Sequence, residues 1–239
     1  MDFRTEVLAD SPSAYFRLGE TSGTSAADAI GGAAGTYTGG FTIPTTGLLA
    51  TDPDGAVTFN GSSGYVTAAH RAAFDLGDTF TLECLIKPTA YRDSGGLGGC
   101  MIDLGGNCPI FRFADSLDGR FILRKNGVST LVTSTVALPL AVLSHVAITK
   151  SGSTVHQYAS GVDVTGTVTN ATMASNSLPF VIGAADGGGN NYFGGVVDEV
   201  IVYPTALSAA RIQTHWLAAI NRPPSPQLAG LAVQRAASF

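Results

Sequence analysis

The sequence contains little charge, little sulfur and little tryptophan. Only 13% of its 239 residues are charged, and it has three cysteines, three methionines and one tryptophan. The net charge is -5 and no stretch concentrates lysine and arginine, so the chain lacks the basic surface that releases counterions from a phosphate backbone. No segment approaches the roughly 20 apolar residues that span a bilayer. We therefore expect no nucleic-acid partner and no membrane insertion.

The first residues also lack the features of a secretory signal. An acidic residue stands at position 2, and residues 1–6 contain no uninterrupted apolar run. A signal peptide needs a positively charged start followed by an apolar stretch of about 7 to 15 residues. We expect the protein to be made in a host cytoplasm without a signal peptide.

The scarce cysteines are interpreted separately. Cys84 lies in an alternating strand pattern and is expected to be a small buried hydrophobic residue. Cys100 and Cys108 flank a glycine-rich loop and could form a bridge. An odd number of cysteines and intracellular synthesis disfavour that disulfide, so the pairing stays open at this point.

Strand signals are abundant. From Ala56 onward they recur between turn residues about every eight to twelve positions, which is typical of an all-β sandwich. The clearest strand is Thr79–Lys87, where apolar side chains at alternate positions share one face and Pro88 ends the pattern. Further strands are predicted at Ala14–Leu18, Gly35–Thr38, Ala56–Phe59, Gly64–Thr67, Met101–Leu104, Ile110–Phe113, Arg120–Arg124, Ser129–Val136, Ser144–Lys150, Ser153–Tyr158, Leu178–Gly183 and Gly195–Tyr203.

Three glycine-containing turns predict how some strands are connected. Asn60-Gly61 is a dipeptide whose residues tolerate positive φ, and it predicts a hairpin between its flanking strands. Asn126-Gly127 and Ser151-Gly152 likewise place glycine where a tight turn needs it. These joints favour antiparallel neighbours.

Helical patterns are confined to the two ends of the chain. Thr5–Ala9 could form one helical turn, and Ser208–Leu217 has helical spacing with a serine at its N-cap. We divide the chain into an N-terminal arm at 1–13, one domain at 14–221, and a proline-rich linker with a tail at 222–239. Packing of the tail on another chain is one interpretation, and folding back on its own domain is the alternative.

Four blocks of sequence resemble one family in their order. They are Ala14-Tyr15-Phe16-Arg17-Leu18-Gly19-Glu20, Val57 to Val66, Phe80 to Pro88, and Tyr192 to Tyr203 followed by Ala206-Leu207-Ser208, with a weaker block at His145 to Lys150. The chain resembles the laminin G-like, concanavalin A-like jelly-roll modules of bacterial and bacteriophage surface proteins. This resemblance implies an all-β, two-sheet antiparallel jelly-roll sandwich with a short C-terminal helix and an extended tail.

The same resemblance implies a structural calcium ion. Members of the family often hold one between the N-terminal loop and the last strand, and the matching positions here are Asp28, Asp198 and Glu20. Calcium prefers carboxylate and carbonyl oxygens from irregular loops. The chain departs from the family after Asp28, where residues 29–32 read Ala-Ile-Gly-Gly and supply no side-chain oxygen.

A catalytic site is not indicated. Glycosidases need two carboxylates placed on either side of the scissile bond, whereas the glutamates at 6, 20, 83 and 199 are scattered. Glu83 is expected to be exposed or ion-paired, and His145 to be a hydrogen-bonded structural residue. Asp198 and Glu199 are neighbours on a strand, so we expect them to point to opposite faces. The interpretation is therefore a protein that is not an enzyme.

One loop offers the chemistry of a sugar site. Asp186, Asn190, Asn191 and Tyr192 combine a carboxylate, two amides and an aromatic ring, which can bind sugar hydroxyls and stack on a sugar ring. The alternative is an ordinary solvated hairpin loop.

These observations favour a non-enzymatic surface module. Residues 7–12 resemble the versions found in virion proteins of actinobacterial phages, so the first hypothesis is a bacteriophage virion protein, either a capsid decoration or a minor tail protein, with host-glycan binding as an added property. It would sit on the virion surface, in a homo-oligomer or larger assembly, and contact other virion proteins through residues 222–239. The alternatives are an extracellular lectin module associated with a secreted enzyme, and a hydrolase whose motif is not evident.

Overall fold

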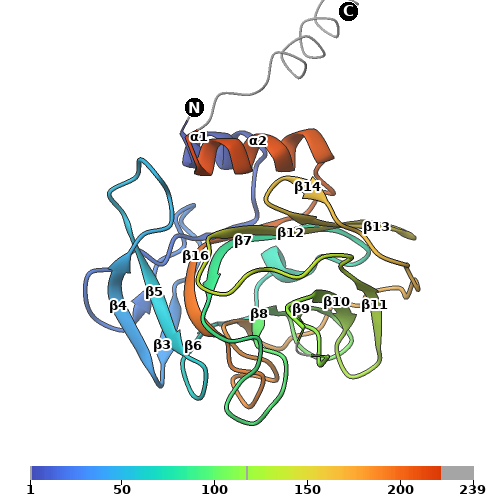
Figure 1. Cartoon of the computed structure of the whole chain (residues 1–239), viewed down its shortest axis with the longest axis horizontal. Coiled ribbons are helices and arrows are strands. Elements are labelled where there is room, and N and C mark those ends of the chain that lie inside the picture. The colour runs from blue at the N-terminus through green and yellow to red at the C-terminus, as the bar shows by residue number, and fades with distance from the viewer. Residues whose placement is uncertain (1, 117, 222–239) are drawn as a thin grey trace, which may run out of the picture.

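The protein is a sandwich of two antiparallel β-sheets with two helices on one outer face. The computed structural model describes residues 2–116 and 118–221. In Figure 1 the two sheets form stacked layers, and the helices lie across the upper one. This architecture confirms the all-β, two-sheet prediction. The tail at 222–239 lies outside the described residues, so its predicted contacts are not addressed.

The upper layer, sheet A, has the strand order β14-β13-β12-β7-β16-β5-β4, with β1 paired to β16. Its strands are β1 (Ala14–Phe16), β4 (Phe41–Thr46), β5 (Gly55–Asn60), β7 (Thr79–Pro88), β12 (Ser144–Ser151), β13 (Thr154–Ala159), β14 (Val162–Asp163) and β16 (Gly194–Tyr203). The long central strand β7 pairs with β12 on one side and with β16 on the other, and all three strands are buried on both faces.

The lower layer, sheet B, has the order β11-β10-β9-β8-β15-β6-β3-β2. Its strands are β2 (Ser25–Ala26), β3 (Gly35–Thr38), β6 (Tyr65–Ala68), β8 (Cys100–Asp103), β9 (Pro109–Phe113), β10 (Phe121–Lys125), β11 (Ser129–Thr133) and β15 (Phe180–Ile182). A 3-10 helix, η1 (Ala72–Phe74), lies between β6 and β7. The two sheets enclose the main apolar core.

Alternation along β7 explains how the core is divided. Phe80, Leu82, Cys84 and Ile86 point between the sheets and join the main core. Leu85 points to the opposite side, where it packs in a second cluster under the helices. Burying a side chain such as Leu85 stabilises the fold by about 1.5–3 kcal/mol. Both faces of β7 are therefore buried, and its burial does not follow the one-sided pattern of a sheet facing water.

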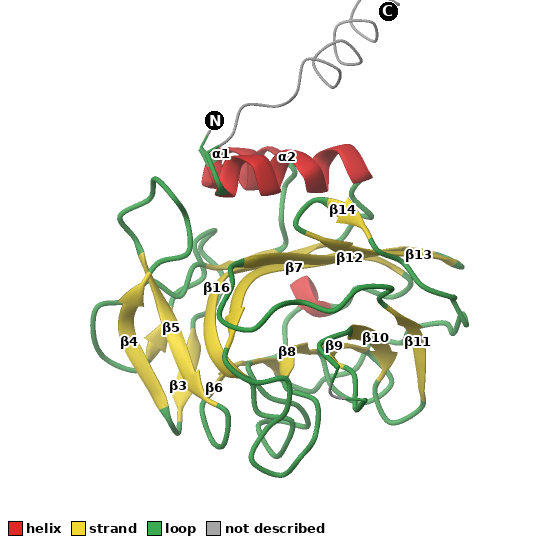
Figure 2. Ribbon diagram, viewed as in Figure 1, coloured by secondary structure: helices red, strands yellow, loops and turns green. Residues whose placement is uncertain are grey.

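Helices α1 (Phe3–Ala9) and α2 (Ala209–Ala219) cover the outer face of sheet A (Figure 2). Each begins with a side-chain cap, because Asp2 accepts from the Thr5 amide and Ser208 accepts from the Arg211 amide. Phe3 contributes to the cluster under the helices. The segment predicted as one helical turn is thus a seven-residue helix. No helix among the described residues is long and apolar enough to cross a membrane.

Several sequence expectations need correction. Asn60-Gly61 does not make a hairpin, because β5 belongs to sheet A and β6 to sheet B. The Asn60 side-chain oxygen instead accepts three successive amides, from Ser62 to Gly64, and the chain crosses between layers. Strands β2, β4 and β14 were not predicted. The strand predicted to reach Val136 ends at Thr133.

Candidate functional site

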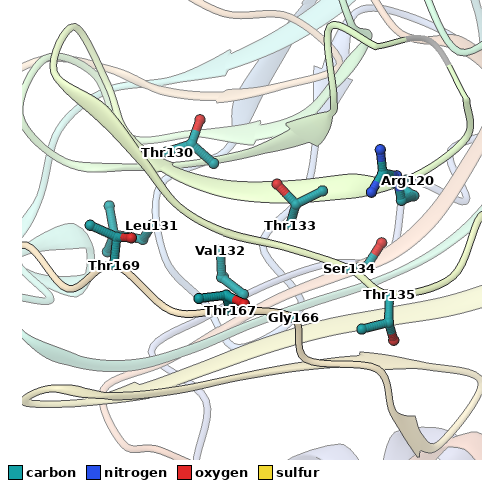
Figure 3. A pocket seen from close by; sticks show the side chains of 10 residues that line it. All are labelled: Arg120, Thr130, Leu131, Val132, Thr133, Ser134, Thr135, Gly166, Thr167 and Thr169. Atoms are coloured by element: carbon teal, nitrogen blue, oxygen red, sulfur yellow. The ribbon is translucent and has the colours of Figure 1, made fainter.

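A surface groove lies beside β11, at the edge of sheet B. Its volume is about 430 Å³, within the range of small-molecule sites. One wall is β11 with the residues that follow it, and the other is the segment 166–169 (Figure 3). The lining residues are Arg120, Thr130, Leu131, Val132, Thr133, Ser134, Thr135, Gly166, Thr167 and Thr169. We call this cavity the β11 groove.

Backbone contacts bring the two walls of the groove together. The Thr169 amide donates a hydrogen bond to the Leu131 carbonyl over 2.7 Å. Gly166 permits the close approach, because a Cβ atom there would lie 2.1 Å from the Thr133 carbonyl oxygen. The segment therefore covers part of the edge of β11, where unpaired backbone groups would otherwise be free to recruit another strand.

The lining of the groove is polar but carries no free charge. Threonine side chains dominate it, and their hydroxyls can donate and accept hydrogen bonds. The Arg120 guanidinium is neutralised by Asp118, whose Oδ2 lies 2.7 Å from Nη2. No carboxylate of the described residues lines the groove. It can hydrogen-bond to a neutral polyhydroxylated ligand, but it has no acid and base to cleave one.

The loop predicted to bind sugar is a folded hairpin whose polar groups are mostly used within the protein. Asp186 Oδ2 accepts from Asn190 Nδ2 over 2.8 Å. Asn191 is buried and donates to a backbone carbonyl of another loop over 2.8 Å, while the Tyr192 hydroxyl donates to a carbonyl of its own loop over 2.7 Å. Asn190 Oδ1 has no protein partner. The four residues lie together, and sugar binding by this loop stays a prediction.

Asp103 and Asn126 hold this loop in place by hydrogen bonds, and sequence reasoning named neither as a site residue. Buried Asp103 accepts from the Asp186 amide over 2.8 Å and from Asn126 Nδ2 over 3.2 Å. Burial raises the pKa of the Asp103 carboxyl. Only the position of Asp103 inside a predicted strand could have drawn attention to it.

The three side chains predicted to hold calcium do not form a common site. Asp28 pairs with Arg71, and Glu20 accepts from the Tyr37 hydroxyl over 2.6 Å. Asp198 accepts from a backbone amide over 2.8 Å. Within residues 2–116 and 118–221, no group of three or more His, Cys, Asp or Glu side chains is arranged to hold a metal ion. The residues present therefore do not fit the predicted calcium ion, whose binding stays an untested prediction.

Asp198 and Glu199 do not point to opposite faces, contrary to expectation. The pairing of β16 with β7 shifts between Asp198 and Ile201, and Glu199 has a φ of 51°, as a β-bulge requires. Tyr15 donates to Glu199 on the outer side of sheet A. Burial, reinforced by the adjacent charge of Glu199, raises the pKa of Asp198. The bulge therefore brings two carboxylates to one side of the strand.

Glu83 is fully buried and bonded to two histidines. Its Oε1 lies 2.7 Å from His145 Nε2 and 3.0 Å from His215 Nδ1. The other nitrogen of His215 lies 3.1 Å from Asp10, so α1, α2, β7 and β12 meet at one charged cluster. Of the two alternatives expected for Glu83, ion pairing agrees with this arrangement and exposure to solvent is wrong. The expectation that His145 is a hydrogen-bonded structural residue also agrees with it. A fully buried carboxylate under two helices cannot reach a substrate in the β11 groove.

A second cavity lies on the outer side of sheet A beside the start of α2. Its volume is about 290 Å³, and it is lined by hydroxyl residues together with His156, Tyr158 and Asp163. His156 Nδ1 lies 2.9 Å from Asp163 Oδ2. Sequence reasoning did not identify this cavity, because its residues are separated by up to 60 positions and carry no motif.

The cysteines are all free and buried. Cys100 donates to the Phe111 carbonyl over 3.6 Å, and Cys108 donates to the Ala174 carbonyl over 2.7 Å. The bridge that the sequence left open does not form. Burial raises the pKa of Cys108 to about 11 and keeps the thiols protonated.

Several solved structures share the fold of this chain, although their sequence identity to it is low. Domain 4 of AbnA, a GH43 extracellular arabinanase from Geobacillus stearothermophilus in complex with arabinotriose, is 15% identical, with a TM-score of 0.63 over 85% of this chain and 97% of that one. The binding domain of Paraclostridial Mosquitocidal Protein 1 is 13% identical, with a TM-score of 0.62 over 87% of this chain and 52% of that one.

Trypanosoma rangeli sialidase is 17% identical, with a TM-score of 0.58 over 86% of this chain and 32% of that one. The chain therefore spans about a third of the sialidase. No curated protein matches the sequence. A family model described as the concanavalin A-like lectin/glucanases superfamily matches residues 60–213. Because that match covers more than half of the 239 residues and the fold has the same two-sheet form, the chain belongs to the concanavalin A-like lectin/glucanases superfamily.

Proposed function

We propose that the protein is a non-catalytic module that binds neutral glycans in the β11 groove. The observation that carries this proposal is the groove itself, which is large enough for a small ligand, lined by hydroxyl residues and free of carboxylates among the described residues. Neutral sugars present many hydroxyls that both donate and accept, and threonine and serine match them without a desolvated charge.

The glutamates support a binding role over hydrolysis. None of those at 6, 20, 83 and 199 lines the groove. Glu83 is engaged by two imidazoles, and Glu199 by Tyr15 and Arg17. Glycoside cleavage needs one carboxyl group to protonate the leaving oxygen and a second on the other side of the bond. The groove has neither.

The structural similarities favour the same role. The arabinanase domain that aligns over 97% of its length was solved in complex with arabinotriose. The other similar structures are a sialidase and a toxin binding domain. The arabinotriose complex of the first structure supports glycan binding as the role of this module.

The proposal also concerns the larger assembly or enzyme to which the module would belong. A bacteriophage virion surface rests on the resemblance of residues 7–12 to phage proteins, and it would use residues 222–239 for contacts with other virion proteins. An extracellular lectin module associated with a secreted enzyme is favoured by the arabinanase domain. Glycan binding in the groove is compatible with both settings, so the groove is tested first.

The test is a glycan array followed by calorimetry on the best neutral oligosaccharide. The double variant Thr133→Val and Thr167→Val removes two hydroxyls from the lining at nearly constant volume. Each lost hydrogen bond costs about 0.5–1.5 kcal/mol, so affinity should fall by roughly 5- to 150-fold. Thr154→Val, in the second cavity, is the matched control.

Three outcomes contradict the proposal. They are a wild-type protein that binds no neutral glycan, an affinity that the double variant leaves unchanged, and glycan cleavage by the wild-type protein. An Asn190→Ala variant separates the groove from the predicted loop, because binding that fails only in this variant assigns the sugar to residues 186–192.

A further inference from the structure

Four carboxylates and one guanidinium meet where the N-terminal strand, the β4–β5 connection and the bulge of β16 come together. Arg17 Nη2 lies 2.6 Å from Asp52 Oδ2, and Nη1 lies 3.1 Å from Asp54 Oδ2. Its Nε lies 3.1 Å from Glu199 Oε1. Asp198 is the neighbour of Glu199 on the same side of the bulge. Three nitrogens of one guanidinium therefore face three different carboxylates.

The side chains of the cluster are largely shielded from water, so their charges need partners within the protein. Arg17 is 18% exposed, and Glu199 is 1% exposed. Gly19 leaves room for one of the carboxylates, since a Cβ atom there would lie 2.0 Å from Asp54 Oδ1. Uncompensated like charges at such distances repel strongly in a medium less polar than water. The fold therefore needs a cation at this position.

One carboxylate oxygen in the cluster has no hydrogen-bond partner among the described residues of the protein. Asp198 is 2% exposed and its Oδ2 accepts from the Leu48 amide, but its Oδ1 has no protein partner. A guanidinium is planar and offers five donors in a fixed fork, and here its three nitrogens are already directed at other carboxylates. Asp198 Oδ1 is therefore a buried carboxylate oxygen that the planar guanidinium of Arg17 does not engage.

We propose that Arg17 is a built-in cation that pairs with three of these four carboxylates and makes the fold independent of calcium. The site lies between the N-terminal segment and the last strand, which is the region where the family resemblance implied a metal. Pairing with Arg71 removes Asp28 from the implied ligand set, and the Tyr37 hydroxyl engages Glu20. The acids around Asp198, which are Asp52, Asp54 and Glu199, are held by Arg17. The guanidinium is part of the chain, so this charge cannot dissociate.

Thermal unfolding of the full chain in excess EDTA and in excess CaCl₂ tests the proposal. The wild-type melting temperature should be the same in both. The Arg17→Gln variant should melt about 5–10 °C lower in EDTA, because buried carboxylates lose their partner. Calcium should recover part of that loss, because removal of the guanidinium leaves Asp52, Asp54 and Glu199 around a position without a cation, and calcium prefers carboxylate oxygens.

Arg71→Gln is the matched control, because it frees Asp28 and leaves the Arg17 cluster intact. It should be destabilised without a response to calcium. If Arg17→Gln does not fold in EDTA, refolding yields in CaCl₂ and in EDTA replace the melting temperatures, and Arg17→Lys tests whether charge alone is enough. A calcium-dependent wild-type melting temperature, a calcium response confined to Arg71→Gln, or an Arg17→Gln variant indifferent to calcium would each overturn the proposal.

Discussion

Replacing Glu83 with glutamine removes the charge at the centre of the cluster under the helices. Burial opposes ionisation, but the charges and hydrogen bonds of His215 and His145 lower the pKa of Glu83 from its usual 4.5 to about 2. A shift of that size corresponds to roughly 3 kcal/mol of folding stability. Breaking a buried ion pair by removing one partner typically costs about 3–5 kcal/mol. The two estimates agree, so Glu83→Gln should lower the melting temperature by about 6–12 °C.

The loss should depend on pH in a defined direction. The folded pKa of Glu83 is below its unfolded value, so its contribution is complete above about pH 4.5 and disappears as the pH falls through about 2. His215 behaves in the opposite sense: burial lowers its pKa, but Glu83 outweighs this and raises it above the usual 6.5. Its contribution is complete below pH 6.5 and is lost as the pH rises through the folded value. The cluster therefore stabilises the protein most between about pH 4.5 and 6.5.

Urea unfolding followed by tryptophan fluorescence is a direct assay. Trp216 is the only tryptophan, and its ring stacks on His145 with centroids 6.2 Å apart. At pH 5.5 the free energy of unfolding of the wild type should exceed that of Glu83→Gln by roughly 3 kcal/mol, and at pH 2.5 by about 1 kcal/mol.

The control is Asp163→Asn, which breaks a histidine–carboxylate pair that is 44% exposed on both sides. Surface pairs contribute about 0–1 kcal/mol, so this variant should change stability little at either pH. Equal losses for Glu83→Gln and Asp163→Asn, or a Glu83→Gln deficit that does not shrink in acid, would refute the assigned role of the buried charge.

Two further predictions concern packing and thiol chemistry. Gly183 has a φ of 84°, and a Cβ atom there would lie 2.6 Å from the Phe59 ring, so Gly183→Ala should cost about 2–4 kcal/mol in urea unfolding. Gly127→Ala, at a similar φ with open space around it, should cost only about 1–2 kcal/mol, and equal losses would contradict the steric reasoning. The three buried cysteines should resist alkylation at pH 8 until the protein is unfolded, and rapid labelling of the native protein would show that the thiols are accessible.

The sequence predicted the strands with periodic patterns best. Alternation in residues 79–87 identified β7, and glycine turns at 127 and 152 correctly predicted the β10–β11 and β12–β13 hairpins. Alternation and turn chemistry are local properties, so they can be recognised without knowing the fold. Asn60-Gly61 shows the limit of this reasoning. The same turn residues can join two strands of one sheet or carry the chain from one sheet to the other, and only the tertiary arrangement decides between them.

The candidate site was much less predictable than the fold. The β11 groove combines Arg120 with residues of β11 and of segment 166–169, which are neither periodic nor rich in charged groups. The bulge at Glu199 was also hidden, because neighbouring residues of a regular strand point to opposite faces and no residue type around Asp198 and Glu199 marks an insertion. An inserted residue changes the face of its neighbours only through the pairing of β16 with β7, and that pairing is not encoded locally.

The positions of the buried charges explain why recognition is expected at the edge of the sandwich. The part of the outer face of sheet A around Glu83 is closed by α1 and α2, and binding there would require separating Glu83 from two histidines. In Figure 1, β13, β14 and β11 lie on one side of the molecule. The chain leaves β14 at Asp163, which lines the second cavity, and reaches the β11 groove three residues later at Gly166. One short segment therefore separates two hydroxyl-lined cavities. Its backbone is anchored to the edge of sheet B by the Thr169 amide, so a ligand can meet preformed walls here without disturbing the core.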